Sequence, residues 1–397
     1  MAVPSIFDDV YVIDADTHLT EPHDLWSSRA PAEFRERLPR VLPDSNGTPT
    51  WVVDGVELSK AGGAAVIKAD GSKVFGTQFF GLGIEDVHAG AYSIADRIST
   101  MDELGVWAQI IYPNTFGLGG QTFAKLADPE LRLLTVKIFN DAMAEMQDQS
   151  ADRLVPMAAL PWWDVDVAVA EVERAHGLGL RGINTTTAPH QHGLPDLGEP
   201  YWNPLWAACS SLGLPINFHI GAAESDIDWF GTVGWPSLGL DQKLAVGSGM
   251  LYLNNASCLA NMVFSGVLER FPTLQIVSVE SGVGWIPFFM QALDHQAGEL
   301  PPGTLDYLSM PPSEYFRRQI HACFWFERTG LAAAIDALGS EHIMFETDYP
   351  HPTCTYPNGL DLAAEALSGL EPRVRRNLMG DNAARLYHIP TPERSGS

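Results

Sequence analysis

The chain has 397 residues, of which 46 % are hydrophobic and 18 % are charged, and its formal net charge is −25. This composition is sufficient to bury a large core, which excludes a globally disordered protein. The acidic charge repels phosphate groups, so neither nucleic acid nor anionic lipid is an expected partner.

Eight short apolar runs, rich in β-branched residues, predict β-strands. In chain order they cover residues 10–16, 106–112, 154–160, 182–184, 214–219, 274–280, 319–324 and 342–347. Helical patterns lie between them at 128–149, 164–176, 202–212, 256–271, 284–296 and 328–338, with further turns near 372 and 381. Asp128 is a candidate N-cap for the longest helix, before Pro129 at its first position. Strands that alternate with helices predict a parallel sheet, and eight such units predict a closed (β/α)₈ barrel.

We expect one barrel domain over residues 1–390, followed by a frayed tail at 391–397. Residues 27–95 carry many Gly and Pro residues and only short strand-like runs, which predicts an insertion after strand one, over the barrel mouth. A second long loop is expected at 221–251, after strand five. Loops that follow the strands form the catalytic face of such barrels.

The first strand ends in acidic and imidazole side chains. Asp14, Asp16 and His18 alternate with smaller or apolar residues. Side chains on a strand repeat with period two, so these three are expected to point to one side, the barrel interior. Asp16 and His18 could then chelate one cation from a single rigid element. The alternative is that the aspartates pair with an arginine or cap a turn.

Polar side chains also end three other predicted strands. His219 ends strand five, Glu280 ends strand six and Asp348 follows strand eight. Because parallel strands in a barrel end at one face, we expect these groups to share a cation with Asp16 and His18. The alternatives are a hydrogen-bonded core residue for His219, an N-cap for Asp348, and a proton donor or N-cap for Glu280.

Weaker candidates surround this set. His321 and His351 could bind substrate or could be hydrogen-bonded core residues. Trp285 and Trp229 lie near predicted strand ends or loops, which favours a pocket for a flat or bulky apolar molecule, although core packing is an equal alternative for each.

These residues resemble the amidohydrolase superfamily, and more closely the amidohydrolase-related family of aminocarboxymuconate-semialdehyde decarboxylase, resorcylate-type decarboxylases and pyrone dicarboxylate lactonase. The resemblance is carried by the segments 13–22, 181–184, 200–221, 280–294, 345–358 and 377–389. It implies a metal-dependent barrel enzyme in which Asp16 and His18 match the metal pair of strand one, His219 the ligand of strand five, and Asp348 the aspartate of strand eight.

Two positions depart from the family pattern. Asn184 stands where binuclear relatives carry a bridging carboxylated lysine, so one ion is expected. Glu280 stands where the decarboxylases usually carry a histidine, and its extra carboxylate would allow a second ion. A mixed nitrogen and oxygen ligand set suits zinc, manganese or iron.

Glu280 therefore favours hydrolysis of a carboxylic acid derivative, an amide, ester, lactone or thioester, with Asp348, Glu280 and His219 as catalytic groups. The alternative is non-oxidative decarboxylation of an aromatic or unsaturated acid, with Asp348 as the proton donor. A non-catalytic binding barrel is a third hypothesis.

The remaining expectations concern location and assembly. Four widely spaced cysteines without a C-x-x-C pair, and an N-terminus without a basic start or an apolar run, predict a cytoplasmic protein. Without an apolar run of about 18 residues no membrane span is expected. Barrels with large mouth insertions often pair, so a homo-oligomer is expected.

Overall fold

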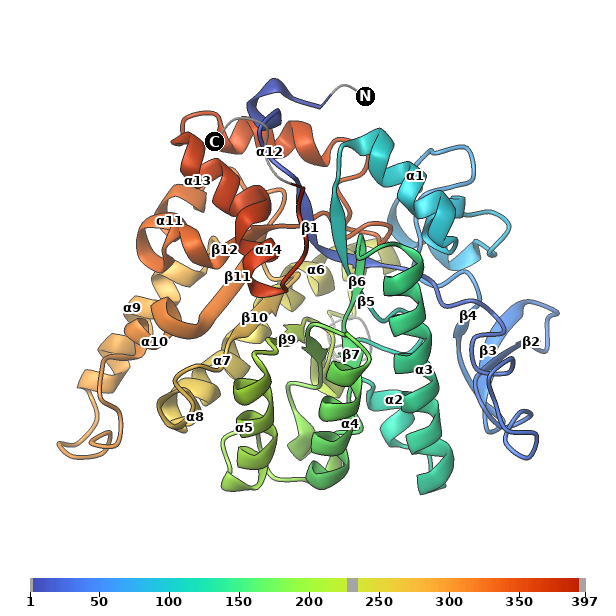
Figure 1. Cartoon of the computed structure of the whole chain (residues 1–397), viewed down its shortest axis with the longest axis horizontal. Coiled ribbons are helices and arrows are strands. Elements are labelled where there is room, and N and C mark those ends of the chain that lie inside the picture. The colour runs from blue at the N-terminus through green and yellow to red at the C-terminus, as the bar shows by residue number, and fades with distance from the viewer. Residues whose placement is uncertain (1–2, 227–234, 393–397) are drawn as a thin grey trace.

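The computed structural model describes residues 3–226 and 235–392 and shows a ring of parallel strands surrounded by helices (Figure 1). The strands of the ring are β1 (Ile13–His18), β5 (Ala108–Tyr112), β6 (Leu154–Pro156), β7 (Ala158–Ala159), β8 (Ile183–Asn184), β9 (Ile216–His219), β10 (Ile276–Val279), β11 (Ile320–Phe324) and β12 (Ile343–Phe345). Each predicted strand overlaps one of these, and the third divides at Met157 into β6 and β7. The predicted parallel α/β fold is confirmed.

The first and last strands close the ring. Thr17 forms a parallel bridge with Tyr349, and the Asp348 amide donates a hydrogen bond of 2.9 Å to the Asp16 carbonyl. The His18 amide donates to the Tyr349 carbonyl at 2.8 Å. The ends of β1 and β12, which carry predicted site residues, are therefore held side by side.

Helices surround the ring and cover one of its ends. They are α1 (Ile94–Leu104), α2 (Gln121–Ala124), α3 (Pro129–Gln149), α4 (Val165–Gly177), α5 (Asn203–Leu212), α6 (Leu240–Leu251), α7 (Asn255–Phe264), α8 (Val267–Arg270), α9 (Ile286–Gly298), α10 (Pro312–Gln319), α11 (Leu331–Leu338), α12 (Gly359–Leu367), α13 (Pro372–Arg376) and α14 (Asn382–Leu386). Asp128 caps α3 as predicted, because its carboxylate accepts the Glu130 and Leu131 amides. The helix expected at 256–271 is interrupted at Gly266, whose φ is 73°, and becomes α7 and α8.

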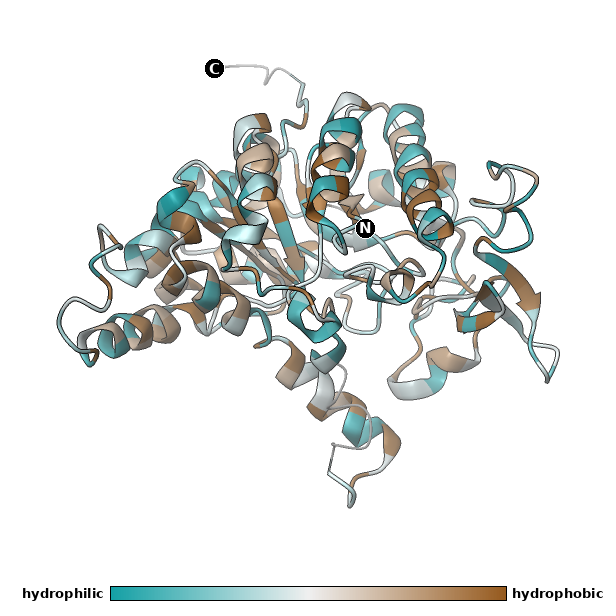
Figure 2. Cartoon of the chain, turned by 90° about the horizontal axis from the view of Figure 1, so that it is seen from below, coloured by the Kyte–Doolittle hydropathy of each residue, from teal (hydrophilic) through white to brown (hydrophobic). Residues whose placement is uncertain are grey.

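Apolar side chains fill both faces of the ring. The strands are buried throughout, as expected for parallel strands covered by helices. Figure 2 shows hydrophobic residues along the central strands, while the surrounding helices carry both hydrophobic and hydrophilic residues. Ile13, Ala15 and Val277 belong to one buried cluster with Tyr387, which follows α14, so α14 covers one open end of the ring.

The segment between β1 and α1 contains a small antiparallel sheet outside the ring (Figure 1). It consists of β2 (Arg40–Pro43), β3 (Pro49–Val53) and β4 (Val56–Lys60). Asp54 and Gly55 connect the last two strands with φ angles of 48° and 82°, the left-handed pair that a tight hairpin turn requires.

One expected loop contains a helix. The loop predicted at 221–251 includes α6, so that prediction is wrong over Leu240–Leu251. Gly247 and Gly249 lie inside this helix and have low helix propensity, which hid it from the sequence pattern. Among the described residues, no helix is both long enough and apolar enough to cross a membrane.

Candidate metal centre

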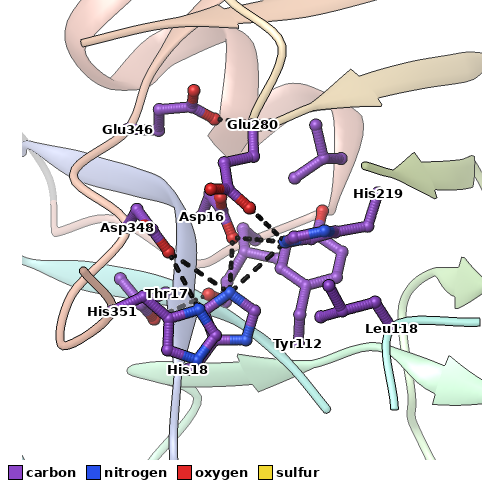
Figure 3. Close-up of polar contacts among 12 residues, drawn as sticks. Asp16, Thr17, His18, Tyr112, Leu118, His219, Glu280, Glu346, Asp348 and His351 are labelled. Carbon is purple, nitrogen blue, oxygen red and sulfur yellow. Dashed lines mark hydrogen bonds and ion pairs between the residues drawn. The ribbon is translucent and has the colours of Figure 1, made fainter. Parts of the chain in front are cut away.

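Four predicted residues converge at the ends of three strands (Figure 3). Asp16 and His18 end β1, His219 ends β9 and Glu280 directly follows β10. Each offers one oxygen or nitrogen atom, and these atoms all lie within 4.8 Å of one another. Asp16, His18 and His219 are fully buried, and Glu280 is 8 % exposed.

Both imidazoles point Nε2 into this cluster. The Nδ1 atom of His18 lies 3.1 Å from the Pro113 carbonyl, and that of His219 lies 2.7 Å from the Ile220 carbonyl. A carbonyl only accepts, so each Nδ1 carries the proton and each Nε2 is left with a lone pair. The two Nε2 atoms are 3.3 Å apart. Two lone pairs at this separation need a positive partner between them.

The carboxylates give the same indication. Both oxygens of Asp16 and one oxygen of Asp348 are buried without a hydrogen-bond partner among the described residues. A buried carboxylate without partners is costly unless it is paired or binds a cation. The donor set of two imidazoles and two carboxylates therefore fits a divalent transition metal.

Burial dominates the titration of the cluster. It raises the pKa of Asp16 and of Glu280 well above the usual range, and the charge of Asp348 raises both further. Burial first, and then the charge of His351, lower the pKa of His18 to about 3. A divalent cation would reverse these directions, because it favours ionised carboxylates and neutral imidazoles.

Asp348 lies beside the four-residue cluster. Its Oδ1 is 3.4 Å from His18 Nε2 and 3.3 Å from His351 Nδ1, and its other oxygen accepts a hydrogen bond from the Thr353 hydroxyl. Burial alone would raise the pKa of Asp348, but His351 and His18 outweigh it and hold the pKa below its usual range.

His351 and Thr353 complete this side of the centre. The His351 ring stacks on His18 with 3.6 Å between ring centroids. Thr353 also contacts Glu280, with 3.3 Å between its hydroxyl and Oε1. Glu280 and Asp348 have φ angles of 53° and 58°, a region that non-glycine residues rarely adopt, and such strain is concentrated at functional sites.

Asp14 does not join the cluster, which corrects the expected common side of β1. The pairing of β1 with β5 shifts register between Asp14 and Thr17, and an irregularity of this kind changes which face a side chain occupies. Asp14 instead lines a small cavity with Met101 of α1 and Leu360 of α12. Burial raises its pKa to about 7.

A buried network supports the ligands from behind. Arg97 donates to the His18 carbonyl and, at 3.0 Å, to Gln109 Oε1, and Gln109 in turn donates to Asp14. Glu346 accepts the Glu280 amide at 3.2 Å. Arg97, Glu346 and Thr353 were not among the predicted site residues: Arg97 lies outside every segment that carries the resemblance, and Glu346 and Thr353 lie within 345–358 without a strand-end position that would mark them.

Three other predicted residues are not brought to the cluster. His321 lies near the N-terminal end of β11, where it is hydrogen-bonded to Gln275 and its ring is tilted against that of His342, which matches the alternative of a hydrogen-bonded core residue. The Trp285 indole donates to the Ser281 carbonyl and packs against Phe289. Trp229 lies outside the described residues.

The model of the amidohydrolase family matches residues 13–389 of the chain. The chain belongs to this family. A γ-resorcylate decarboxylase from Polaromonas sp. is 25 % identical over 266 residues, which are 64 % of this chain and 76 % of the relative.

Solved structures share the fold. An amidohydrolase from Mycobacterium avium subsp. paratuberculosis superposes with a TM-score of 0.73 at 23 % identity, over 96 % of this chain and 99 % of that one. A dihydroxybenzoic acid decarboxylase from Polaromonas sp., with bound manganese and the inhibitor 2-nitroresorcinol, gives a TM-score of 0.62 at 18 % identity, over 97 % and 99 %.

The expectation that the enzyme is a hydrolase is wrong. The curated relative and the manganese-bound structure are both decarboxylases. The expectation rested on a carboxylate at position 280. Glu280 lies within one compact ligand cluster with Asp16, His18 and His219, so a role as metal ligand explains its presence without hydrolysis.

Proposed function

We propose that this enzyme is a metal-dependent, non-oxidative decarboxylase of an aromatic carboxylic acid. The observation that carries the proposal is the buried, unsatisfied ligand cluster with Asp348 beside it, held by two imidazoles and a hydroxyl. The decarboxylases among its relatives support the same chemistry.

Asp16, His18, His219 and Glu280 would hold one divalent cation. We propose manganese, because a relative of the same fold carries it and the mixed ligand set suits it. When bound, this ion supplies positive charge that anchors the anionic oxygens of the acid.

Asp348 would deliver the proton. In decarboxylation the bond between the ring carbon and the carboxyl group breaks, CO₂ leaves, and the ring carbon keeps the electron pair. That carbon then takes a proton that Asp348 receives from solvent and passes on, because the lowered pKa of Asp348 leaves its carboxylate ionised at neutral pH. His351 and Thr353 orient Asp348 through its two oxygens.

We further propose that residues 27–95, which include the β2–β4 sheet, form an insertion over the mouth of a single domain at 1–390. The frayed tail at 391–397, a homo-oligomer and a cytoplasmic location stay predictions.

The test is product analysis on manganese-loaded enzyme with hydroxybenzoates. We expect CO₂ and the corresponding phenol, and Asp348→Asn should lower kcat by about 10²- to 10⁴-fold while the metal content is kept. Thr304→Val, a change at an exposed hydroxyl, is the control. Release of an alcohol or amine from esters or amides, without CO₂ from any acid, would contradict the proposal.

A further inference from the structure

A cavity of about 390 Å³ lies beside the candidate metal centre. Its walls are the segment 66–76, helix α6 and the loop residues Pro352 and Thr353. The volume is in the range of small-molecule sites. Thr353 contacts both Asp348 and Glu280, so the inner end of the cavity is one side chain away from two carboxylates of the centre.

The walls of the cavity are mainly apolar. Val66 and Val74 face it from one side and Leu244 of α6 from the other, and these three belong to one hydrophobic cluster. Tyr252 lies next to Thr353 and packs edge-on against Trp325, with ring centroids 5.5 Å apart. Such a space suits a flat aromatic ring.

Lys73 is the single cation among the residues that line this cavity. Its ammonium donates to the Cys354 carbonyl at 2.5 Å, one residue beyond Thr353. No ion pair within residues 3–226 and 235–392 involves Lys73, whereas Lys68 on the same segment pairs with Asp70 at 3.6 Å. An ammonium has three donors, so Lys73 keeps capacity for an anionic ligand.

We propose that this cavity holds the substrate ring and that Lys73 binds a second carboxylate on it. The inference rests on the proposed function and narrows its substrate class to aromatic dicarboxylic acids. A carboxylate is ionised at neutral pH, whereas a phenol with a pKa of about 10 is neutral and would not balance the ammonium. One carboxyl group leaves as CO₂ at the metal centre, and the second stays on the product.

The test compares salicylate with its dicarboxylate analogues, hydroxyterephthalate and hydroxyisophthalate, on manganese-loaded enzyme. The affinity for each acid is measured by calorimetry and its KM by the rate of CO₂ release, for the wild type and for Lys73→Met. We expect Lys73→Met to weaken the binding of the preferred diacid by about 10- to 100-fold, seen mainly as a higher KM. The affinity and KM for salicylate should be unchanged. Lys73→Arg should restore much of the difference.

Lys68→Met is the matched control, because Lys68 is a half-exposed lysine of the same segment outside the cavity. Equal effects of Lys73→Met on salicylate and on both diacids, or no effect on any of them, would overturn the inference. Diacid binding that depends on Lys73 but gives no CO₂ would support the cavity and refute the proposed function. CO₂ release with a preference for diacids that is the same in the wild type and in Lys73→Met would support the proposed function and refute the role of the cavity.

Discussion

Asp14 and Asp16 lie on the same strand and are both fully buried, but their surroundings are opposite. Asp14 accepts hydrogen bonds from the Thr347 amide at 2.8 Å, from the Thr347 hydroxyl at 2.5 Å and from Gln109 at 3.3 Å. Neither oxygen of Asp16 has a hydrogen-bond partner in the part of the chain that the structure describes. A satisfied carboxylate joins strands, whereas an unsatisfied one is available to an ion.

Asp16→Asn should give the largest effect in this comparison. Loss of a ligand charge is expected to weaken manganese binding by more than about 100-fold, beyond the loss typical of residues that only support a ligand. Metal analysis and titration measure this loss. Manganese at 100 times its Kd should stabilise the wild type by about 2.7 kcal/mol and the variant by far less, which thermal unfolding tests. Equal stabilisation of both proteins would exclude Asp16 as a ligand.

Asp14→Asn should lower the stability of the fold rather than the affinity for the metal. An amide group can no longer accept from both Thr347 donors, so we expect a loss of about 1–3 kcal/mol in the free energy of unfolding. Urea denaturation of the metal-free protein measures this loss. Manganese affinity should fall less than in Asp16→Asn. If the two variants lost metal equally, the distinction between the two aspartates would be wrong.

Thr347→Val should give the smallest effect. It removes one hydroxyl donor to Asp14 and keeps the β-branched shape, the backbone amide and Gln109, so about 1 kcal/mol of stability should be lost. Thr304→Val, which removes a surface hydroxyl bonded to the Pro301 carbonyl, is the control for urea denaturation. Equal urea midpoints for Thr347→Val and Thr304→Val would show that the Thr347 hydroxyl does not stabilise the fold through Asp14.

The strands were predictable because each is buried on both faces and therefore appears as a continuous apolar run. The same logic located His219 and Glu280, since a polar residue that ends such a run lies at the barrel mouth. His351 also lies at the centre, next to Asp348. His321 stands near the start of its strand and so lies at the opposite end of the barrel, which fits the alternative of a hydrogen-bonded core residue.

Other features depend on the folded chain. No residue type marks the register shift in β1, so the sequence alone assigned Asp14 to the wrong side. Thr353 and Lys73 are an ordinary hydroxyl and an ordinary lysine until the loop after β12 meets the segment 66–76. Glu280 suggested the wrong reaction, because one carboxylate is compatible with either chemistry.

The junction of β1 with β12 has a consequence for biosynthesis. Asp16 and His18 are made long before the residues that pair with them, Asp348 and Tyr349, which lie far along the chain. Contacts this distant in sequence form late, because a long loop must close first. A nascent chain that stops before β12 lacks the hydrogen bonds that hold the end of β1 in place, so Asp348 joins the ligand cluster only after β12 has been made.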